Sequence, residues 1–190
     1  LTMKILVLDN YDSFTYNLVY IVRQLGYGDV MDVFRNDKIS LDEVDQYDKI
    51  LLSPGPGVPE DAGIMPELLK RYADSKSILG VCLGHQAIGE AFGGSLINLS
   101  EVLHGVASPV KVQKDLLFEG IPDKFSIGRY HSWVIDESTL SPDLEVIART
   151  PDKQIMAVRH KTFAVRGVQF HPESILTENG IRIVKNWLES

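Results

Sequence analysis

The sequence predicts a single α/β domain: a central, mostly parallel sheet with helices on both faces, followed by an antiparallel elaboration in the second half. Short apolar runs without polar alternation, typical of strands buried on both faces, alternate with helical periodicities through the first half. Strands dominate the second half, with little helix between them. No repeat, low-complexity segment or long linker divides the 190 residues, so one domain is expected over residues 3–190.

In the first half, strands are expected at residues 4–8, 30–34, 50–52 and 77–81. Helices are expected at residues 65–73 and 84–92, after a first helix that Ser13 is placed to cap and Gly26 to stop. The apolar stripe of this first helix consists of Phe14, Leu18, Ile21, Val22 and Leu25. Because ligand sites form at the carboxyl ends of parallel strands, the loops after Leu8, Leu52 and Val81 should share one edge.

In the second half, strands are expected at residues 106–112, 145–148, 155–159 and 163–168. The last two are separated by three residues and should form an antiparallel hairpin. A final helix is expected to begin at Thr177. Its apolar face consists of Ile181, Val184, Trp187 and Leu188.

Charge and cysteine content exclude several classes of protein. The net charge of −7 argues against a nucleic-acid surface, which is usually basic, and offers no polybasic segment to an anionic membrane. No apolar run approaches the ~18 residues of a membrane helix. No targeting signal precedes the first strand, so a cytoplasmic location is expected. The single cysteine, Cys82, excludes an intrachain disulfide and a Cys-rich zinc site.

Cys82 lies in Gly80-Val81-Cys82-Leu83-Gly84, between a predicted strand and a predicted helix. Gly-x-Ser-x-Gly elbows present a nucleophile in this context, and their glycines leave room for a strained turn. The helix N-terminus would favour a thiolate, and the backbone amide of Leu83 would point at the substrate oxygen. A buried structural cysteine is the alternative. The glycines on either side, Gly80 and Gly84, form a glycine frame that favours a nucleophilic over a structural cysteine.

A cysteine nucleophile needs a base, and His171 in Gln169-Phe170-His171-Pro172-Glu173 is the best candidate. Pro172 favours an extended backbone at His171, so residues two apart project to the same side and Glu173 can fix the tautomer of the imidazole. A surface histidine and glutamate in a loop are the alternative. The other four histidines, which are more often structural or exposed than catalytic, are His85, His104, His131 and His160.

The loop Ser53-Pro54-Gly55-Pro56-Gly57 follows a buried strand and should lie on the same edge as Cys82. Its glycines and prolines make a rigid loop with accessible backbone amides, which suits an oxyanion hole. A plain turn is the alternative, and a phosphate loop fits poorly because no Gly-Lys-Ser/Thr follows. The sequence contains no His-Glu-x-x-His motif or carboxylate cluster of metal-binding type, so no metal site is expected.

Together these motifs resemble the class I (triad) glutamine amidotransferases. The matching segments, in the family's order, are residues 9–18, 53–57, 80–86, 131–132 and 171–177. The first and last segments are similar to the subfamily that serves chorismate enzymes, the glutaminase components of anthranilate synthase and aminodeoxychorismate synthase. The resemblance implies a glutamine amidotransferase type-1 domain over residues 3–190.

The resemblance also implies a mechanism. Cys82 would attack the side-chain amide of glutamine, with His171 as its base and Glu173 orienting His171. The backbone amides of Gly57 and Leu83 would hold the oxyanion, and water would hydrolyse the γ-glutamyl thioester. Glutamine would be bound by Gly55, Pro56, Gly57, Gln86, Ser132 and Trp133.

Two positions depart from the family's pattern. The subfamily more often has leucine where this chain has Trp133, and the family commonly has lysine where this chain has Val106. A backbone contact to glutamine survives the change at Trp133, although the packing around the substrate can differ.

Ammonia released into water would be protonated, so the resemblance implies a synthase partner that receives it through a sheltered path. That partner is expected to be a chorismate-using subunit on a separate chain. Mg²⁺ is expected only on the partner, and no cofactor in this chain. The first expectation is anthranilate synthase; the alternatives are aminodeoxychorismate synthase, or one subunit serving both. A stand-alone cysteine hydrolase and a catalytically silent module are the competing classes.

Overall fold

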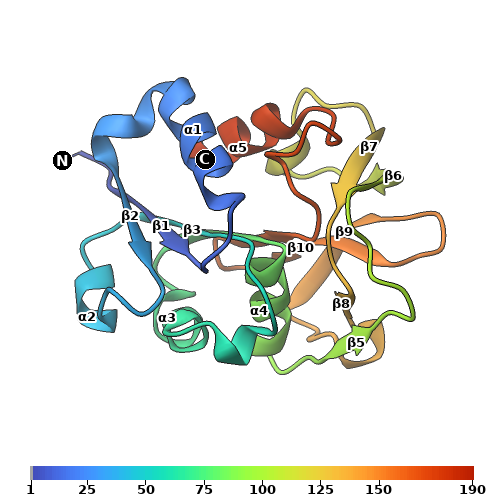
Figure 1. The fold of residues 1–190 in the computed structure, drawn as a ribbon, viewed down its shortest axis with the longest axis horizontal. Helices are drawn as coiled ribbons and strands as arrows, with labels where there is room; N and C mark the ends of the chain where they lie inside the picture. The colour runs from blue at the N-terminus through green and yellow to red at the C-terminus, as the bar shows by residue number, and fades with distance from the viewer. Residues whose placement is uncertain (1) are drawn as a thin grey trace.

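A computed structural model describes residues 2–190, and Leu1 lies outside the described residues. A nine-stranded sheet with the order β2-β1-β3-β4-β11-β10-β9-β6-β7 runs through the molecule (Figure 1). Its parallel part consists of β2 (Met31–Arg35), β1 (Ile5–Asp9), β3 (Lys49–Leu52), β4 (Ser77–Val81) and β11 (Val165–Val168). Its antiparallel part continues with β10 (Ile155–His160), β9 (Leu144–Arg149), β6 (Val106–Val112) and β7 (Lys124–Arg129). The predicted α/β sheet with its antiparallel elaboration is confirmed.

Helices cover both faces of the sheet, as predicted (Figure 1). One face carries α1 (Thr15–Val22) and α5 (Gly180–Leu188), and the other carries α2 (Leu41–Val44), α3 (Met65–Tyr72) and α4 (Leu83–Ala91). Alternate residues of β1 enter the two cores: Ile5 and Val7 pack on the α1 side, and Leu6 and Leu8 on the α4 side. Because both faces of the strand are buried, its sequence shows no polar alternation.

Smaller elements connect these layers. A two-stranded sheet pairs β5 (Leu96–Asn98) with β8 (Trp133–Ile135). Short helical turns of π or 3-10 geometry cover Arg23–Tyr27, Gly28–Val30, Pro59–Asp61, Leu116–Phe118 and Glu137–Thr139. Among the described residues, none of the helices has the length and apolar content that crossing a membrane requires.

Most predicted elements are confirmed within two residues of their bounds, and the hairpin of β10 and β11 is antiparallel as expected. The sequence analysis missed α2, β5, β7 and β8. Helix α2 is a single turn, too short to show an apolar periodicity. Its only sequence signal is the capping box between Ser40 and Glu43. Strands β5 and β8 have only three residues each, which is too short for a periodic pattern.

The predicted starts of two helices were wrong. Helix α1 begins at Thr15, and Ser13 does not cap it; instead the Asp12 carboxylate accepts a hydrogen bond from the Phe14 N–H at 2.9 Å. Gly26, with φ of 96°, ends the helical stretch as predicted. The last helix begins at Gly180 rather than at Thr177, whose hydroxyl is occupied by bonds to the backbone.

The buried face of α5 also differs from the prediction. Ile181 is 52% exposed, whereas Ile183 is fully buried beside Val184 and Trp187. The later start of the helix changes which residue begins the apolar stripe, because Thr177 and the two residues after it are not helical. The remaining predicted positions of the stripe are buried as expected.

The junction between β4 and α4 is a close contact of backbone on backbone at the carboxyl edge of the sheet. A β-carbon on Gly80 would lie 2.5 Å from the backbone of Gly84, and one on Gly84 would lie 2.7 Å from the backbone of Leu52 in β3. The start of α4 therefore packs directly on the backbones of two strands. This close approach positions Cys82, the residue between them.

Gly84→Ala is expected to lower the free energy of unfolding by about 3 kcal/mol, because the added methyl group meets backbone that cannot move aside. Gly89→Ala in the same helix is the control. There the methyl group meets the Ile135 side chain, which can adjust, and alanine favours the helix, so the change should stay within about 1 kcal/mol. Urea denaturation measures both, and equal losses would contradict the backbone contact at Gly84.

Candidate active site

The parallel strands bring four predicted segments to one edge of the sheet. Asn10 follows β1, the loop of residues 53–57 follows β3, Cys82 follows β4, and His171 lies shortly after β11. Val81 and Val168 are paired in the parallel register of β4 and β11, and the Cys82 N–H donates to the Val168 carbonyl at 2.8 Å. Cys82 and His171 are thereby brought together from the two halves of the sequence.

Cys82 occupies the elbow that the glycine frame predicts. Its backbone, at φ of 54° and ψ of −99°, lies outside the regions that L-residues ordinarily adopt. It is the residue before the first turn of α4, and its side chain is a free thiol that is only slightly exposed. The thiol lies 3.8 Å from the carbonyl of Tyr130, to which it can donate.

His171 and Glu173 form the pair that the His-Pro-Glu spacing predicts. The imidazole Nδ1 lies 2.5 Å from Glu173 Oε1, and both side chains are almost completely buried. The segment is held by backbone contacts: the His171 N–H donates to the Gly128 carbonyl, and the Thr177 hydroxyl donates to the His171 carbonyl. The second carboxylate oxygen of Glu173 has no hydrogen-bond partner within residues 2–190.

The surroundings of His171 favour its charged form. Burial acts against the charge, but the Cys82 side chain and the Glu173 carboxylate outweigh it and raise the pKa of His171 above its ordinary value. The ring is also flanked by aromatic side chains, with centroid distances of 5.3 Å to Phe14 and 4.9 Å to Tyr130. The imidazole of His171 is thus suited to hold a proton beside Cys82 and Glu173.

The loop of residues 53–57 lies beside the elbow, as predicted. Pro56 and Leu83 line the same cavity of about 310 Å³, and Gly57 is exposed with φ of 72°, a left-handed conformation that favours glycine. Asn10 holds the loop in place, because its backbone N–H donates to the Ser53 hydroxyl and its side chain donates to the Ser53 carbonyl, both at 2.8 Å.

Gln86 in α4 lies close to Ser132 and Trp133, which stand at the start of β8. The buried Gln86 amide donates to the Trp133 carbonyl at 3.0 Å. His131 Nδ1 lies 2.9 Å from the same carbonyl, which fixes this peptide unit from a second side. The Ser132 carbonyl accepts a hydrogen bond from the Leu99 N–H. Because the contact to Trp133 uses its backbone, the tryptophan side chain does not disturb it.

The remaining histidines have different environments. His85 is fully buried with no partner for either ring nitrogen in the described structure, and burial lowers its pKa to about 3. Burial, together with the nearby charge of Arg129, lowers the pKa of His131 to about 4. His160 stacks on Phe163 at a centroid distance of 4.2 Å, and His104 is exposed. None of these four pairs with a carboxylate as His171 does, within the part of the chain described.

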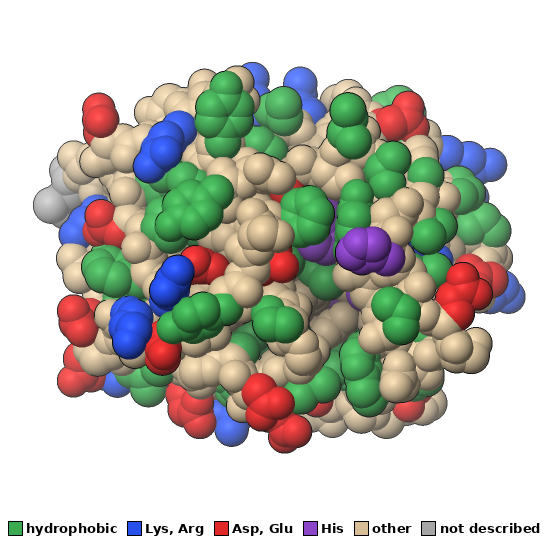
Figure 2. Space-filling model, in the orientation of Figure 1, with side chains coloured by type: hydrophobic (Ala, Val, Ile, Leu, Met, Phe, Trp, Pro, Cys, Tyr) green, Lys and Arg blue, Asp and Glu red, His purple; other side chains and the backbone are tan. Residues whose placement is uncertain are grey.

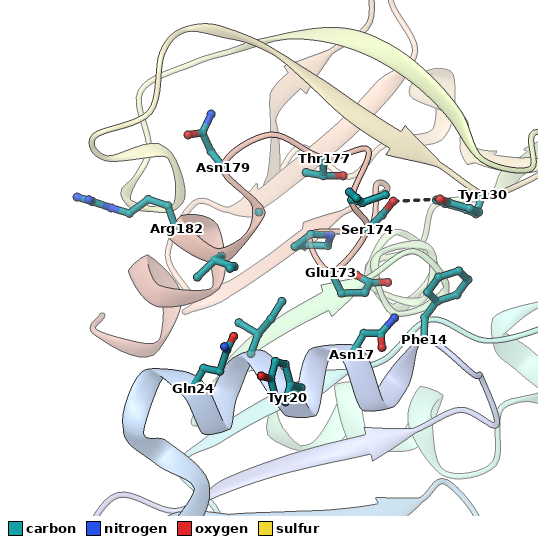
Figure 3. Close-up of a pocket in the computed structure, with 15 residues that line it drawn as sticks. Phe14, Asn17, Tyr20, Gln24, Tyr130, Glu173, Ser174, Thr177, Asn179 and Arg182 are labelled. Atoms are coloured by element: carbon teal, nitrogen blue, oxygen red, sulfur yellow. Dashed lines mark hydrogen bonds between the residues drawn. The ribbon is translucent and has the colours of Figure 1, made fainter.

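A groove of about 710 Å³ borders the site on the carboxylate side (Figure 3). Glu173 lines it, whereas Cys82 and Gln86 do not, so the groove adjoins the thiol site without containing it. Helix α1 and its flanks form one wall, and the segment after Pro172 forms the other. In the orientation of Figure 1, Figure 2 shows histidine side chains at a hollow that is bordered by hydrophobic side chains.

Two buried residues, Asn10 and Gln169, and the half-buried Tyr130 lie at the site but were not among the predicted catalytic or glutamine-binding residues. Asn10 and Gln169 are polar residues directly after buried apolar strands, which is the signal that could have marked them. Tyr130 carries no such signal, because its position depends on the antiparallel part of the sheet. Within residues 2–190 no group of three or more His, Cys, Asp or Glu side chains could hold a metal ion.

Comparison with known proteins agrees with the motifs. A family model described as glutamine amidotransferase class-I matches residues 6–190. A curated Bacillus subtilis protein, aminodeoxychorismate/anthranilate synthase component 2, is 42% identical over 188 residues, which cover 98% of this chain and 96% of that protein. The bifunctional protein TrpGD of Thermotoga maritima is 43% identical over 187 residues, but the chain spans only 32% of that relative.

A solved structure agrees with the fold. The crystal structure of a Thermoplasma acidophilum protein, described as a component of GMP synthase, superposes with a TM-score of 0.87 at 27% sequence identity. The match covers 100% of this chain and 94% of that one. The arrangement of sheet and helices is therefore shared along the full length.

His85 is expected to make the fold sensitive to acid. Its pKa is about 3 in the folded protein and about 6.5 when unfolded, so below pH 6.5 only the unfolded state binds the proton. The free energy of unfolding should therefore fall as the pH drops from 6.5 towards 3, by up to about 1.4 kcal/mol per pH unit from this group. His85→Met should flatten that decline in urea titrations between pH 7 and pH 4.

The same substitution at the exposed His104, His104→Met, is the control for loss of an imidazole. If the His85→Met and wild-type proteins lose stability equally between pH 7 and pH 4, His85 does not contribute to the acid sensitivity.

Proposed function

This chain belongs to the class I glutamine amidotransferase family, and from that membership we propose that it is the glutaminase subunit of an anthranilate synthase. It would hydrolyse glutamine and supply ammonia to a chorismate-using synthase subunit. The observation that supports the proposal most directly is the buried group of Cys82, His171 and Glu173 at the carboxyl edge of the sheet. A positioned base with its own orienting carboxylate beside a thiol is the arrangement that thiol acyl transfer requires.

In the proposed first step the Cys82 thiol gives its proton to His171, and the sulfur attacks the side-chain amide carbon of glutamine. The carbonyl electron pair moves to the oxygen, where the backbone amides of Gly57 and Leu83 would stabilise the negative charge. His171 then gives the proton to the amide nitrogen, the carbon–nitrogen bond breaks, and ammonia leaves. Glu173 keeps Nδ1 of His171 protonated and its ring oriented throughout.

In the proposed second step water attacks the γ-glutamyl thioester and His171 accepts its proton. The tetrahedral intermediate is again held by the same amides, and collapse releases glutamate and the thiol. The chemistry requires no cofactor in this chain, and we place the Mg²⁺ of the synthase reaction on the partner alone. The reaction depends on a reduced thiol, which is consistent with a cytoplasmic location.

We assign glutamine binding to the loop beside the elbow and to the peptide unit that Gln86 holds. The rigid loop would contribute Gly55, Pro56 and Gly57, and the other side of the substrate would meet Gln86, Ser132 and Trp133. The bond from Gln86 to the Trp133 carbonyl supports the assignment, because it fixes the backbone that the substrate would contact.

The partner is proposed to be a separate chorismate-using subunit that shelters the ammonia from water. Aminodeoxychorismate synthase, or service to both synthases by one subunit, is the alternative, and the Bacillus subtilis relative whose name includes both synthases supports it. A stand-alone cysteine hydrolase would instead show full activity without any partner. A glutaminase assay of the chain alone and in complex separates these functions.

Cys82→Ser is expected to abolish glutamine-dependent synthesis, by at least about a thousandfold, because a hydroxyl at this elbow cannot replace the thiolate. Ammonia-dependent synthesis by the complex should persist, since the partner's chemistry does not use the sulfur. Steady-state assays with each nitrogen source measure the two rates. Equal loss of both would exclude the proposed ammonia supply.

Glu173→Gln is expected to lower kcat for glutamine hydrolysis about 10²- to 10⁴-fold with little change in KM, because the carboxylate orients the base and does not contact the substrate. Glu178→Gln is the matched control. Glu178 lies in the same segment, and its carboxylate accepts a hydrogen bond from the Ser126 N–H away from the thiol. An unchanged kcat in Glu173→Gln would remove Glu173 from the mechanism.

A further inference from the structure

Gln169 is a buried polar side chain at the thiol that the mechanism above does not use. The register of β4 and β11 pairs Val81 with Val168, so the next residues of the two strands, Cys82 and Gln169, lie side by side. The Gln169 side chain is completely buried. Its amide nitrogen donates to Cys82 Sγ at a distance of 3.6 Å.

The direction of this amide is fixed by its neighbours. Gln86 Nε2 donates to the Trp133 carbonyl, which can only accept, so the amide of Gln86 has one possible orientation. Its nitrogen also lies 3.4 Å from Gln169 Oε1 and donates to that oxygen. With its oxygen bound to Gln86, the Gln169 amide must present its N–H groups to the sulfur.

The sulfur of Cys82 has a different hydrogen-bonding role in each protonation state. As a thiol, Cys82 can donate to the Tyr130 carbonyl. As a thiolate it cannot donate, and the Tyr130 oxygen then faces a negative charge. Gln169 is a neutral donor already directed at the sulfur, and His171 is the charged group whose pKa the Cys82 side chain raises. A hydrogen bond to an ionised acceptor is about twice as strong as one between neutral groups.

We propose that Gln169 is a catalytic residue whose side-chain N–H stabilises the anionic sulfur of Cys82 before attack on glutamine, and whose oxygen couples the sulfur through Gln86 to the Trp133 peptide. The proposal rests on the function assigned to Cys82 above. The step itself is unchanged: the sulfur lone pair forms the bond to carbon, and the carbonyl electron pair moves to oxygen. As the sulfur loses its negative charge, its bond with Gln169 weakens.

The contribution of Gln169 therefore depends on pH. At neutral pH it increases the fraction of sulfur that is anionic, which accelerates any reaction of the thiolate. At high pH, where the sulfur is ionised in any case, the same hydrogen bond makes it a slightly weaker nucleophile. A residue that only supports the fold would change the rate at all pH values in the same direction.

Alkylation of the protein by iodoacetamide tests this directly, because Cys82 is the single cysteine and the label on its peptide, measured by mass spectrometry, reports on this thiol. In Gln169→Met the donor is lost with little change in volume. The alkylation rate at pH 7 should fall about tenfold, and the pH of half-maximal rate should rise by about one unit. The rate at the high-pH plateau should equal or exceed that of the wild type.

Two further variants keep the test decisive. Gln169→Glu retains the length of the side chain and the acceptor for Gln86 but presents an acceptor to the sulfur, so its alkylation at pH 7 should be slower still. Asn186→Leu removes a different buried amide, which donates to the Leu117 and Glu119 carbonyls, and it should leave the pH profile unchanged. Thermal denaturation confirms that each variant is folded before alkylation.

A wild-type pH profile in either folded Gln169 variant, or an equal shift in Asn186→Leu, would overturn the proposal. The alkylation assay uses neither glutamine nor a synthase, so its result is independent of the glutaminase assignment. A failure of the Cys82→Ser prediction with a shifted alkylation profile would reject the proposed function and leave the contact between Gln169 and Cys82 established.

Discussion

Cys82 holds a backbone conformation that L-residues rarely adopt, and the organisation of the site depends on keeping it there. Such strain costs about 1–3 kcal/mol and persists only where the surrounding structure over-determines it. Here a hydrogen bond to Val168 fixes the residue from one neighbouring strand, and the approach of Gly84 to the backbone of Leu52 fixes the helix on the other. The two buried cores on either side of the sheet provide the stability that offsets this strain.

Strand β11 joins the two halves of the fold and determines what lies beside the thiol. It runs parallel to β4 and antiparallel to β10, so it is the boundary between the parallel and antiparallel parts of the sheet. Because β11 neighbours β4, residues nearly ninety positions after Cys82 emerge next to it: Gln169 in direct contact and His171 shortly after. The antiparallel strands beyond β11 then supply Tyr130 and the carbonyl of Gly128 that hold this segment.

The buried histidines illustrate how environment sets charge. His171 and His85 are both almost completely buried, and burial lowers the pKa of each. His171 has a carboxylate partner and the Cys82 side chain, which reverse that effect, whereas His85 has no hydrogen-bond partner for its ring among the residues described. His171 is therefore suited to hold a proton at the site, whereas His85 in the first turn of α4 remains neutral.

The sequence by itself determined the α/β order, the elbow at Cys82 and the pairing of His171 with Glu173, because each depends on local rules: strand and helix periodicity, glycine spacing, and the extended backbone before Pro172. It did not predict that Ser13 leaves the first helix uncapped, because the neighbouring Asp12 carboxylate accepts the hydrogen bond from Phe14 instead. It also did not predict that Thr177 lies outside the last helix, because the partners of its hydroxyl include Gly128 in a distant segment. Only the tertiary structure decided that β11 lies beside β4. That long-range pairing brings Gln169 to the sulfur and leaves His85 without a partner, because register between distant strands is set by the packing of the whole sheet.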